Sequence, residues 1–541
     1  MRKYIISFVL LISLFFALSV YADNTPDWVR NFDPYQKYPA DKYLAGFGTS
    51  SGKDSEAFRV AKDNARAAVS RAIVVDVDSM IRTVKEEDEE KFSQHLSSIT
   101  QSSTALQIMG LDTETYAEDS PPTVYAVAYV SKADLGRIYA RKKTDLIDEI
   151  SRIISDAQKA ERDSRSIDAA TKYLSLYPLY QQLKEAETVL LVVGEVRNIE
   201  DAFSDLNKEL GQGTANPVKA KIPTWTEVRN KIDELLSQDL NTVEDVARSV
   251  IIQLSKQAGD LNGRMLINSF SYQDTKMGSP FSRYFKSALE NQLVLMSNLK
   301  WDTVKKAEDF TPKSANITAD LAKASGAQWV LSGTYWEQGD KIKIMASLNE
   351  AETSKILAGA DVVFDKSMLE AAHLSVKPQN YQQAIQEQEA FKEDQIISGN
   401  LTLEVWTNKG NEDLIFNEGE VMKVRVRVNR PAYVRLLYII ADGKRSLLYD
   451  NYYIDSSRVN HVVEIPEEFE CAPPFGAEML VAIARTTEFP PIEVINVDGY
   501  DFLATDTAKN AAYQSRGMIR KKQKPEDIQQ TEAKIVITTM E

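Results

Sequence analysis

The sequence predicts a multidomain α+β protein, in which an N-terminal α+β domain, a helical hairpin, an α/β domain and a C-terminal β-sandwich follow one another. Three observations predict this fold class. The chain has 541 residues, which is more than one hydrophobic core usually supports. Its 43% hydrophobic and 26% charged residues are typical of folded globular proteins. The period of the hydrophobic residues also changes along the chain, from mixed patterns to helical stripes and finally to alternation.

The charge balance bears on the class of partner. Lys and Arg number 64 whereas Asp and Glu number 79, so the formal net charge is −15. An acidic surface repels nucleic acid and anionic lipid, and we expect neither to bind the surface as a whole. A local basic patch remains compatible with this balance.

The first 22 residues have the pattern of a secretory signal peptide, with cleavage after Ala22. Arg2 and Lys3 give a positive start, and Ile5–Leu18 is almost wholly apolar but shorter than the ~20 residues of a membrane span. No other stretch is long and apolar enough to span. Cys471 is the only cysteine, so we expect neither lipidation nor a disulfide. The mature protein is expected in the periplasm or at the outer membrane.

Residues 23–135 are expected to form the N-terminal α+β domain. A short strand, Tyr43–Gly48, runs into a glycine turn, and Asp54 can cap the helix that follows. Ala72–Val77 continues as a β-branched run and Thr123–Val130 supplies another strand. The helix carries small residues at helical spacing, which allows close packing on a sheet: Ala57, Ala61, Ala65, Ala68 and Ala72.

Residues 136–206 are expected to form the helical hairpin. Pro178 follows the second apolar stripe and should end or kink its helix. The pair is similar to a tetratricopeptide unit, although one pair is too few to establish a repeat. Glycines and prolines in 207–224 indicate a linker. The two stripes are Leu146, Ile150, Ile153 and Ala157, and then Ile167, Ala170, Leu174 and Tyr177.

Residues 225–372 are expected to form the α/β domain, in the order helix, strand, helix, strand, helix and then two or three strands. Met265–Phe270 is the first predicted strand, and Thr318 can cap a helix over Ala319–Ser325. Gly339-Asp340 is a tight turn between antiparallel strands. The polar, Gln-rich residues 373–398 indicate a helical connector.

Residues 399–500 are expected to form the β-sandwich, because short strands are separated by Pro and Gly. Asp442-Gly443 predicts a hairpin turn. Residues 501–541 are expected to hold a basic helix, around Arg516–Lys524, and a final strand, Lys534–Thr539. One strand has a buried and a solvated face, because Met422, Val424, Val426 and Val428 alternate with Lys423, Arg425 and Arg427.

Three segments resemble known families. The opening resembles the LPP-twenty outer-membrane lipoprotein family through 26–29 (PDWV), 43–48 (YLAGFG), the alanine helix and 125–130 (YAVAYV). Members of that family are often lipid-anchored, whereas this sequence lacks the cysteine. Trp329–Tyr335, with the Gly-Asp turn and the strands that follow, is similar to the periplasmic α/β domain of curli-secretion CsgG, flagellar FlgO and the lipoprotein activators of penicillin-binding proteins.

The third resemblance covers Val421–Ala484, which is similar to the domain of unknown function DUF forty-three eighty-four. It rests on 430–433 (RPAY), 442–444 (DGK) and 474–478 (PFGAE). None of the three families brings a catalytic residue that can be transferred to a position in this chain. Together the resemblances imply an envelope protein that works by binding.

Ser50 stands in a Gly-x-Ser-x-Gly pattern between a predicted strand and a predicted helix, as the nucleophile of a hydrolase does. Too few mature residues precede it for the strands that such a fold requires. The three histidines, His95, His373 and His461, do not lie in an alternating βα series. We therefore expect no catalytic residue and no enzyme activity, and keep an exported serine hydrolase as an alternative.

Other glycine patterns give no cofactor. Gly46, Gly48 and Gly52 come near a dinucleotide fingerprint, with Asp76 or Asp78 as a ribose-binding acid, but the spacing is one residue too long and a second βαβ half is missing. These glycines are better explained by close packing of a helix on a strand. Scattered histidines and a single cysteine do not assemble a zinc site. We expect no cofactor and no metal.

The exposed candidates for recognition are the aromatic residues Trp28, Trp225, Tyr452 and Tyr453. We expect an exported, non-catalytic accessory or scaffold subunit in the assembly of an outer-membrane, flagellar or surface machine. Its partners would be other envelope proteins, peptidoglycan or an outer-membrane complex, and its oligomeric state stays open. An activator of a cell-wall synthase is an alternative.

Overall fold

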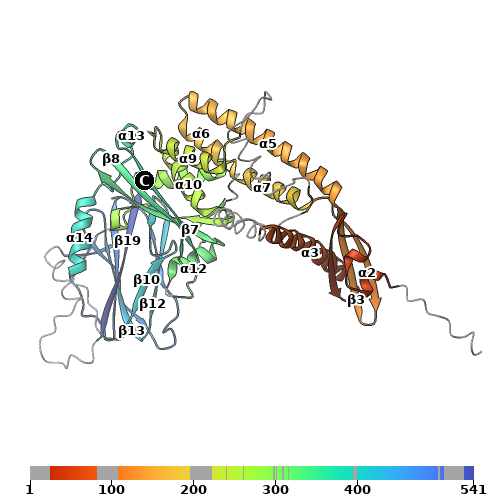
Figure 1. Ribbon diagram of the computed structural model, residues 1–541. Coiled ribbons are helices and arrows are strands. Elements are labelled where there is room, and N and C mark those ends of the chain that lie inside the picture. The colour runs from red at the N-terminus through yellow and green to blue at the C-terminus, as the bar shows by residue number, and fades with distance from the viewer. Residues whose placement is uncertain are drawn as a thin grey trace, which may run out of the picture. The chain divides into compact units, whose positions relative to one another are not determined.

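The computed structural model describes residues 25–81, 108–194, 222–504 and 529–541, apart from 239, 260, 297–298, 300, 308–309, 315, 394–398 and 498–499. The predicted signal peptide, most of the predicted linker, His95 and the predicted basic helix lie outside the described residues. The chain divides into two compact units (Figure 1). The first comprises Met1–Asp156 and Leu176–Val228, and the second comprises Ala157–Ser175 and Arg229–Glu541. No described helix is both long and apolar enough to cross a membrane.

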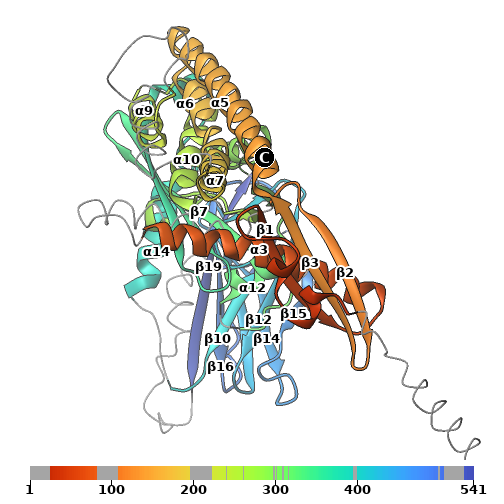
Figure 2. The same cartoon turned by 45° about the vertical axis from the view of Figure 1, so that its right-hand side comes forward.

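The first unit is built on a three-stranded antiparallel sheet in the order β1-β3-β2. A long helix, α3, lies along one face of this sheet (Figure 2). The N-terminal segment covers the other face with a cluster of aromatic side chains. The elements are α2 (Asp27–Arg30), η1 (Pro34–Gln36), β1 (Tyr43–Ser51), α3 (Ser55–Ile81), β2 (Asp112–Asp119) and β3 (Pro122–Ser131).

Gly46 and Gly48 bring β1 against α3. A Cβ atom on either residue would overlap main-chain atoms of Ala65 in the helix, so no larger side chain fits without moving the helix. The prediction that these glycines serve close packing is confirmed. The prediction of a turn at Gly48 is wrong, because β1 continues to Ser51 and pairs with β3 along its whole length.

The prediction of a strand over Ala72–Val77 is also wrong, because α3 runs through these residues. The buried stripe of α3 repeats every four residues as Ala61, Ala65, Val69 and Ile73. Ile73 therefore stays on the sheet only if the helix continues, while the side chain of Val75, two residues on, is 65% exposed. Packing against the sheet outweighs the β-branched composition of this segment.

Helices α5 (Lys132–Arg162) and α7 (Tyr177–Val192) complete the first unit, and α5 continues into the second. Tyr139 of α5 is buried in the same core as Ala186 and Val189 of α7. Pro178 stands in the first turn of α7. At this position its missing N–H costs nothing. The helix of the second predicted stripe, α6 (Ser166–Leu174), ends before Pro178 as predicted, whereas Tyr177 belongs to the next helix.

The α/β part of the second unit is a six-stranded mixed sheet in the order β6-β4-β7-β8-β9, with β5 paired to β7. β6, β4 and β7 are parallel, whereas β8 and β9 continue as an antiparallel meander. The bounds are β4 (Gly263–Ile267), β5 (Ser271–Tyr272), β6 (Trp301–Val304), β7 (Trp329–Gln338), β8 (Lys341–Glu350) and β9 (Ile356–Asp365).

Helices cover both faces of this sheet. α11 packs Phe281 against Tyr335 and Phe364 on one face, with ring centroids 5.0 Å and 6.0 Å apart. α12 packs Ala322 beside Leu266 on the other face. The N-cap of α12 is Asn316 rather than the predicted Thr318. The helices are α6 (Ser166–Leu174), α9 (Trp225–Leu236), α10 (Val243–Ala258), α11 (Pro280–Leu295), α12 (Ile317–Ala324), α13 (Ser367–Ala371) and α14 (Tyr381–Glu393).

The rest of the second unit is the predicted β-sandwich. A three-stranded sheet, β10-β12-β15, faces a seven-stranded sheet, β11-β19-β16-β13-β14-β18-β17, across a shared apolar core. The final strand, left outside the sandwich in the sequence analysis, pairs with β16 and β11 within the larger sheet. The strands are β10 (Leu403–Thr407), β11 (Leu414–Asn417), β12 (Val421–Val428), β13 (Ala432–Ile439), β14 (Arg445–Ile454), β15 (Val463–Glu470), β16 (Ala477–Arg485), β17 (Val494–Val497), β18 (Tyr500–Leu503) and β19 (Gln530–Met540).

The predicted two-faced strand is β12. Its four apolar residues are buried in the sandwich core, as predicted. The prediction that the opposite face is solvated is wrong at Arg425, whose side chain is 7% exposed. A segment of the α/β part covers this face, because Arg425 donates to the Phe310 carbonyl at 3.1 Å and Arg427 to the Ser314 carbonyl at 2.7 Å.

Candidate functional site: a basic cleft between the α/β sheet and the sandwich

A cleft of about 660 Å³ lies in the second unit where the α/β part meets the sandwich. The α/β part contributes the ends of β4 and β6 and one side of α11. The sandwich contributes the segment from the end of β10 to the start of β12. The charged residues that line the cleft are Arg283, Lys286, Glu290, Lys305, Lys306, Lys409, Asp413, Glu420 and Lys423.

The strand order explains why a cleft forms at this place. The chain leaves β4 through α11 to β6 on one side, and returns through α12 to β7 on the other side of β4. Right-handed crossovers in opposite directions put the two helices on opposite faces, so the chain diverges above the carboxyl ends of β4 and β6. Ligands of parallel α/β sheets bind in such crevices. Ser269 and Lys305, which follow these two strands, line the cleft.

One face of α11 forms a wall of the cleft. Ser279 caps the helix by accepting a hydrogen bond from Ser282 N at 3.2 Å, which fixes where the first turn begins. Arg283, Lys286 and Glu290 follow at spacings of three and four residues, so they share one face.

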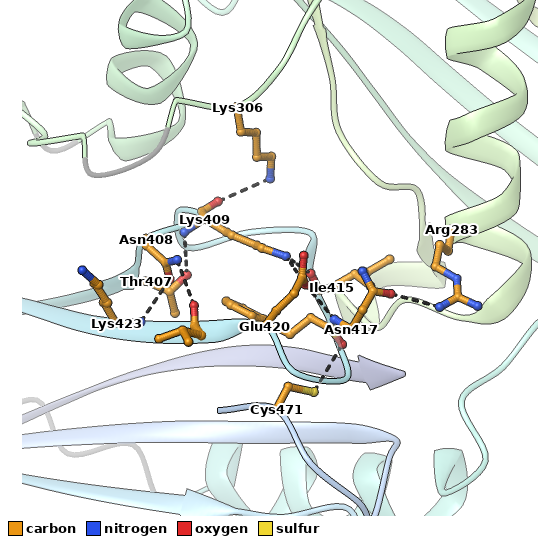
Figure 3. Close-up of polar contacts among 12 residues, drawn as sticks. Arg283, Lys306, Thr407, Asn408, Lys409, Ile415, Asn417, Glu420, Lys423 and Cys471 are labelled. Carbon is orange, nitrogen blue, oxygen red and sulfur yellow. Dashed lines mark hydrogen bonds and ion pairs between the residues drawn. The ribbon is translucent and has the colours of Figure 1, made fainter. Parts of the chain in front are cut away.

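The sandwich side of the cleft is organised around Lys409 (Figure 3). Its Nζ donates to the Ile415 carbonyl at 2.9 Å and to Glu420 Oε2 at 2.5 Å. Glu420 Oε2 also accepts from the backbone N–H of Asn417 at 2.7 Å. Arg283 of α11 reaches across and donates to Asn417 Oδ1 at 3.0 Å. These bonds hold β11 and its flanking loops against α11.

Two of the lysines have no such partner. Within the described residues, no hydrogen bond or ion pair engages the ammonium group of Lys286 or Lys305. Lys306 donates only a long bond, 3.4 Å, to the Lys409 carbonyl. Lys423 is paired with Glu468 at 3.1 Å. Six basic residues face three acidic ones in the lining, so the cleft is positive in a protein of net charge −15.

Burial shifts the titration of three groups in the cleft. It lowers the pKa of Lys306 to about 8, and repulsion from Lys286 lowers it in the same direction. The pKa of Lys286 is lowered as well, chiefly by burial. Burial raises the pKa of Asp413 to about 6 against the attraction of Lys306. Burial and mutual repulsion disfavour the charged form of these lysines, and a bound anion would stabilise that form.

The aromatic residues proposed for recognition do not line this cleft. In the first unit, Trp28 is 3% exposed in the core beneath the sheet, so the folded surface does not offer it to a partner. Trp225 is half-buried, and its ring lies 5.0 Å from that of Tyr177 and 6.0 Å from that of Tyr180. Both tryptophans therefore have packing partners inside the unit.

The other two candidates lie on β14 of the sandwich. Tyr452 packs against the sandwich core, and its hydroxyl accepts a hydrogen bond from Arg458 at 3.1 Å. Tyr453 is 46% exposed and lies beside Tyr433, with ring centroids 4.7 Å apart. Of the four aromatic candidates, Tyr453 is the one that the structure leaves open to contact.

The remaining candidate residues have local explanations. Ser50 lies inside β1 opposite Val124, and its hydroxyl donates to the Ser51 carbonyl at 3.5 Å, so it does not occupy the sharp turn of a nucleophile elbow. Cys471 is buried at the sandwich core, where burial raises the pKa of its thiol to about 11. In the part of the chain that the structure describes, no group of His, Cys, Asp and Glu side chains is arranged to hold a metal ion.

The cleft was not predicted, although part of its signal is visible in the sequence. Lys305 and Lys306 directly follow a strand of a parallel sheet, which puts them at the edge where ligands bind. The helical spacing of Arg283 and Lys286 could also be read from the sequence. No pattern marks Lys409 or Asp413, because they lie in a loop that only the packing of the sandwich brings to this edge.

One part of the second unit matches a known protein family. Residues 415–488, which run from β11 past the end of β16, match the domain of unknown function DUF4384. The resemblance stated from the sequence for this region is therefore confirmed. No curated protein matches the chain.

Several solved structures are similar in part. The C-terminal domain of LpoB from Escherichia coli is 14% identical over 23% of this chain and 96% of its own, with a TM-score of 0.18. The PelC dodecamer from Paraburkholderia phytofirmans is 12% identical over 20% of this chain and 73% of its own, with a TM-score of 0.15. The secreted protein HP1454 from Helicobacter pylori is 9% identical over 65% of this chain and 95% of its own, with a TM-score of 0.19. At these TM-scores, none of the three carries an argument about this chain.

Proposed function

We propose that the protein is an exported, non-catalytic accessory or scaffold subunit in the assembly of an outer-membrane, flagellar or surface machine. It acts in the periplasm or at the outer membrane without a lipid anchor, and it works by holding a partner in the basic cleft. The signal-peptide pattern of residues 1–22 supports export. The LPP-twenty resemblance of the first unit and the CsgG/FlgO resemblance of the α/β part support a role in the envelope.

The observation that carries the binding role is the cleft itself. It joins the carboxyl ends of two parallel strands to a sandwich segment whose residues 415–423 lie within the DUF4384 match. Lys286 and Lys306 repel each other there, and neither forms an ion pair within the described residues. Buried charges that are not paired cost stability. Such an arrangement is typical of a site that a ligand completes.

Site-directed photo-cross-linking in intact envelopes tests this function. A photoreactive residue at Lys305, which is exposed at the cleft, is expected to capture one defined set of envelope proteins. Capture should be lost in the Lys286→Gln/Lys306→Gln double variant. A matched probe at Lys323, which is exposed on α12 outside the cleft, should capture a different set or none. Identical capture from both positions would contradict the proposal.

The alternative activator of a cell-wall synthase rests on the resemblance of Trp329–Tyr335, which the structure places in β7 of the sheet beside the cleft. Its test is direct. Purified protein added to a purified wall synthase would increase the rate of glycan polymerisation, and the double variant would not. The hydrolase alternative predicts that Ser50→Ala abolishes an ester or peptide hydrolysis that the wild-type protein performs.

A further inference from the structure

We propose that the cleft binds the phosphate group of a phosphate monoester, held by Lys286, Lys305 and Lys306. This inference rests on the proposed function in taking the cleft as a binding site, and adds the chemical class of what is bound. The three lysines come from two elements, the cleft side of α11 and the segment after β6, and all three line the same cavity.

The charge of the cleft favours an anion. The lining carries an excess of basic over acidic residues, although the chain as a whole is acidic. Low-dielectric walls concentrate the field of such a cleft and attract anions into it. Glu420 does not offset the charge of the three lysines, because it is already engaged by Lys409 at 2.5 Å. Three carboxylates attract these lysines: Glu290 acts on Lys286, Glu412 acts on Lys306, and Asp413 acts on both.

The identity of the free cations favours phosphate over carboxylate. Planar carboxylates are best recognised by the two parallel N–H groups of an arginine. The one arginine of the cleft, Arg283, is already committed to Asn417 and to the Glu541 carbonyl. Lysines act as point charges, and several of them suit a compact group that carries up to two negative charges.

The size and lining of the cleft suit a ligand that has an organic part in addition to its charged group. Its volume of about 660 Å³ is in the range of sites that enclose small organic ligands. Apolar side chains lie beside the lysines and offer contact to an uncharged body: Leu266, Ile267, Val304, Ile415 and Val421. A phosphate monoester, which has an organic part attached to a dianionic group, matches both features. Its source is either a soluble metabolite or the exposed headgroup of a lipid.

Binding to the purified full-length mature chain tests the inference by titration calorimetry at fixed ionic strength. The probes are glycerol 3-phosphate, inorganic phosphate, acetate, and vesicles of phosphatidic acid in phosphatidylcholine. We expect glycerol 3-phosphate to bind more tightly than inorganic phosphate, and acetate not to bind detectably. Lys286→Gln and Lys306→Gln should each weaken binding of glycerol 3-phosphate by about tenfold or more.

Asp413→Asn is a variant that should raise the affinity for glycerol 3-phosphate instead of lowering it. It removes a negative charge that acts on both lysines. At a pH low enough to keep Lys306 protonated without that charge, binding should become severalfold tighter. Lys323→Gln, on an exposed side chain outside the cleft, is the matched control and should leave the affinity unchanged. Misfolding can lower the affinity of a lysine variant, but it cannot produce the gain of affinity that is expected for Asp413→Asn. Thermal melting of each variant checks its folding.

The outcomes separate the sources and the two proposals. Binding of glycerol 3-phosphate but not of vesicles assigns the phosphate to a soluble molecule, whereas vesicle binding that the lysine variants lose assigns it to a lipid headgroup. Acetate binding as tightly as glycerol 3-phosphate, or equal affinity in wild type, Lys306→Gln and Asp413→Asn, would overturn the inference. Failure of the envelope cross-linking with phosphate binding intact would instead overturn the accessory role and leave the ligand class standing.

Discussion

Arg425 donates a hydrogen bond from its Nη1 atom to the main-chain oxygen of Phe310, 3.1 Å away. The arginine belongs to β12 of the sandwich, and the phenylalanine lies in the α/β part, 115 residues earlier in the chain. Arg425 is also paired with Glu464 of β15 at 2.8 Å. The contact turns what would be a solvated strand face into an internal boundary of the second unit, and it joins the two parts that form the cleft.

Removal of this contact should destabilise the second unit. Arg425→Gln leaves the Phe310 carbonyl and Glu464 without their charged donor, and we expect the free energy of unfolding to fall by about 2 kcal/mol. Urea denaturation measures the change. Lys444→Gln is the control, because its ion pair with Asp442 is largely exposed and should contribute less than about 1 kcal/mol. Equal effects of the two substitutions would show that the boundary contributes nothing.

Gly48→Ala should destabilise the first unit strongly. The added methyl group would overlap the main chain of Ala65, which cannot move aside as a flexible side chain can. We expect a loss of about 3 kcal/mol or more in the free energy of unfolding, at the upper end of the overpacking range. Gly359→Ala, in strand β9, is the matched control, because a Cβ there meets only ordinary contacts. It should change stability by less than about 0.5 kcal/mol.

Glu478 should make the protein less stable as the pH rises towards neutrality. Burial raises the pKa of this carboxyl from 4.5 to about 7, so the folded state holds a proton that the unfolded state releases. The stabilisation is complete below pH 4.5 and is lost as the pH rises through 7, by about 3 kcal/mol in total.

Chemical denaturation of the wild type and of Glu478→Gln between pH 4.5 and 8 measures this dependence. The variant should lack this component, since its amide has no proton to release. Glu467→Gln, on an exposed residue of the same sandwich, should retain the full pH dependence. Parallel stability curves for the wild type and Glu478→Gln would contradict the assignment.

Glu337, at the end of β7, should have the opposite effect in acid. Burial favours its neutral form, but hydrogen bonds from Lys366, Lys377 and Tyr272 outweigh burial and lower the pKa from 4.5 to about 2. The folded state therefore resists protonation. This contributes about 3 kcal/mol of stability above pH 4.5, which is lost as the pH falls through 2.

Acid titration of Glu337→Gln against the wild type measures that contribution. The variant should be less stable at pH 7 and should lose less stability between pH 4.5 and 2. Glu352→Gln, on an exposed turn after β8, should follow the wild-type curve. If Glu337→Gln kept both the neutral stability and the acid response of the wild type, the three donors would have no energetic role.

Some of the fold could be predicted because it rests on local periodicity. The buried face of β12, the hairpin turn at Asp442-Gly443 and the close packing at the glycines of β1 were predicted correctly. The predictions failed where local composition and packing disagree. Ala72–Val77 has the residues of a strand, yet Ile73 reaches the core only as part of a helix.

The sequence by itself determined the mixed α+β fold class, the strand-rich C-terminal region and the acidic charge balance. Tertiary structure alone decided that Arg425 is covered, that the last strand enters the sandwich sheet, and that Lys286, Lys306 and Asp413 share a cleft. The physical reason is the separation in sequence over which each effect acts. Periodicity and turn chemistry act over a few neighbouring residues, whereas the charges of the cleft come from segments more than a hundred residues apart, whose proximity depends on how finished elements pack.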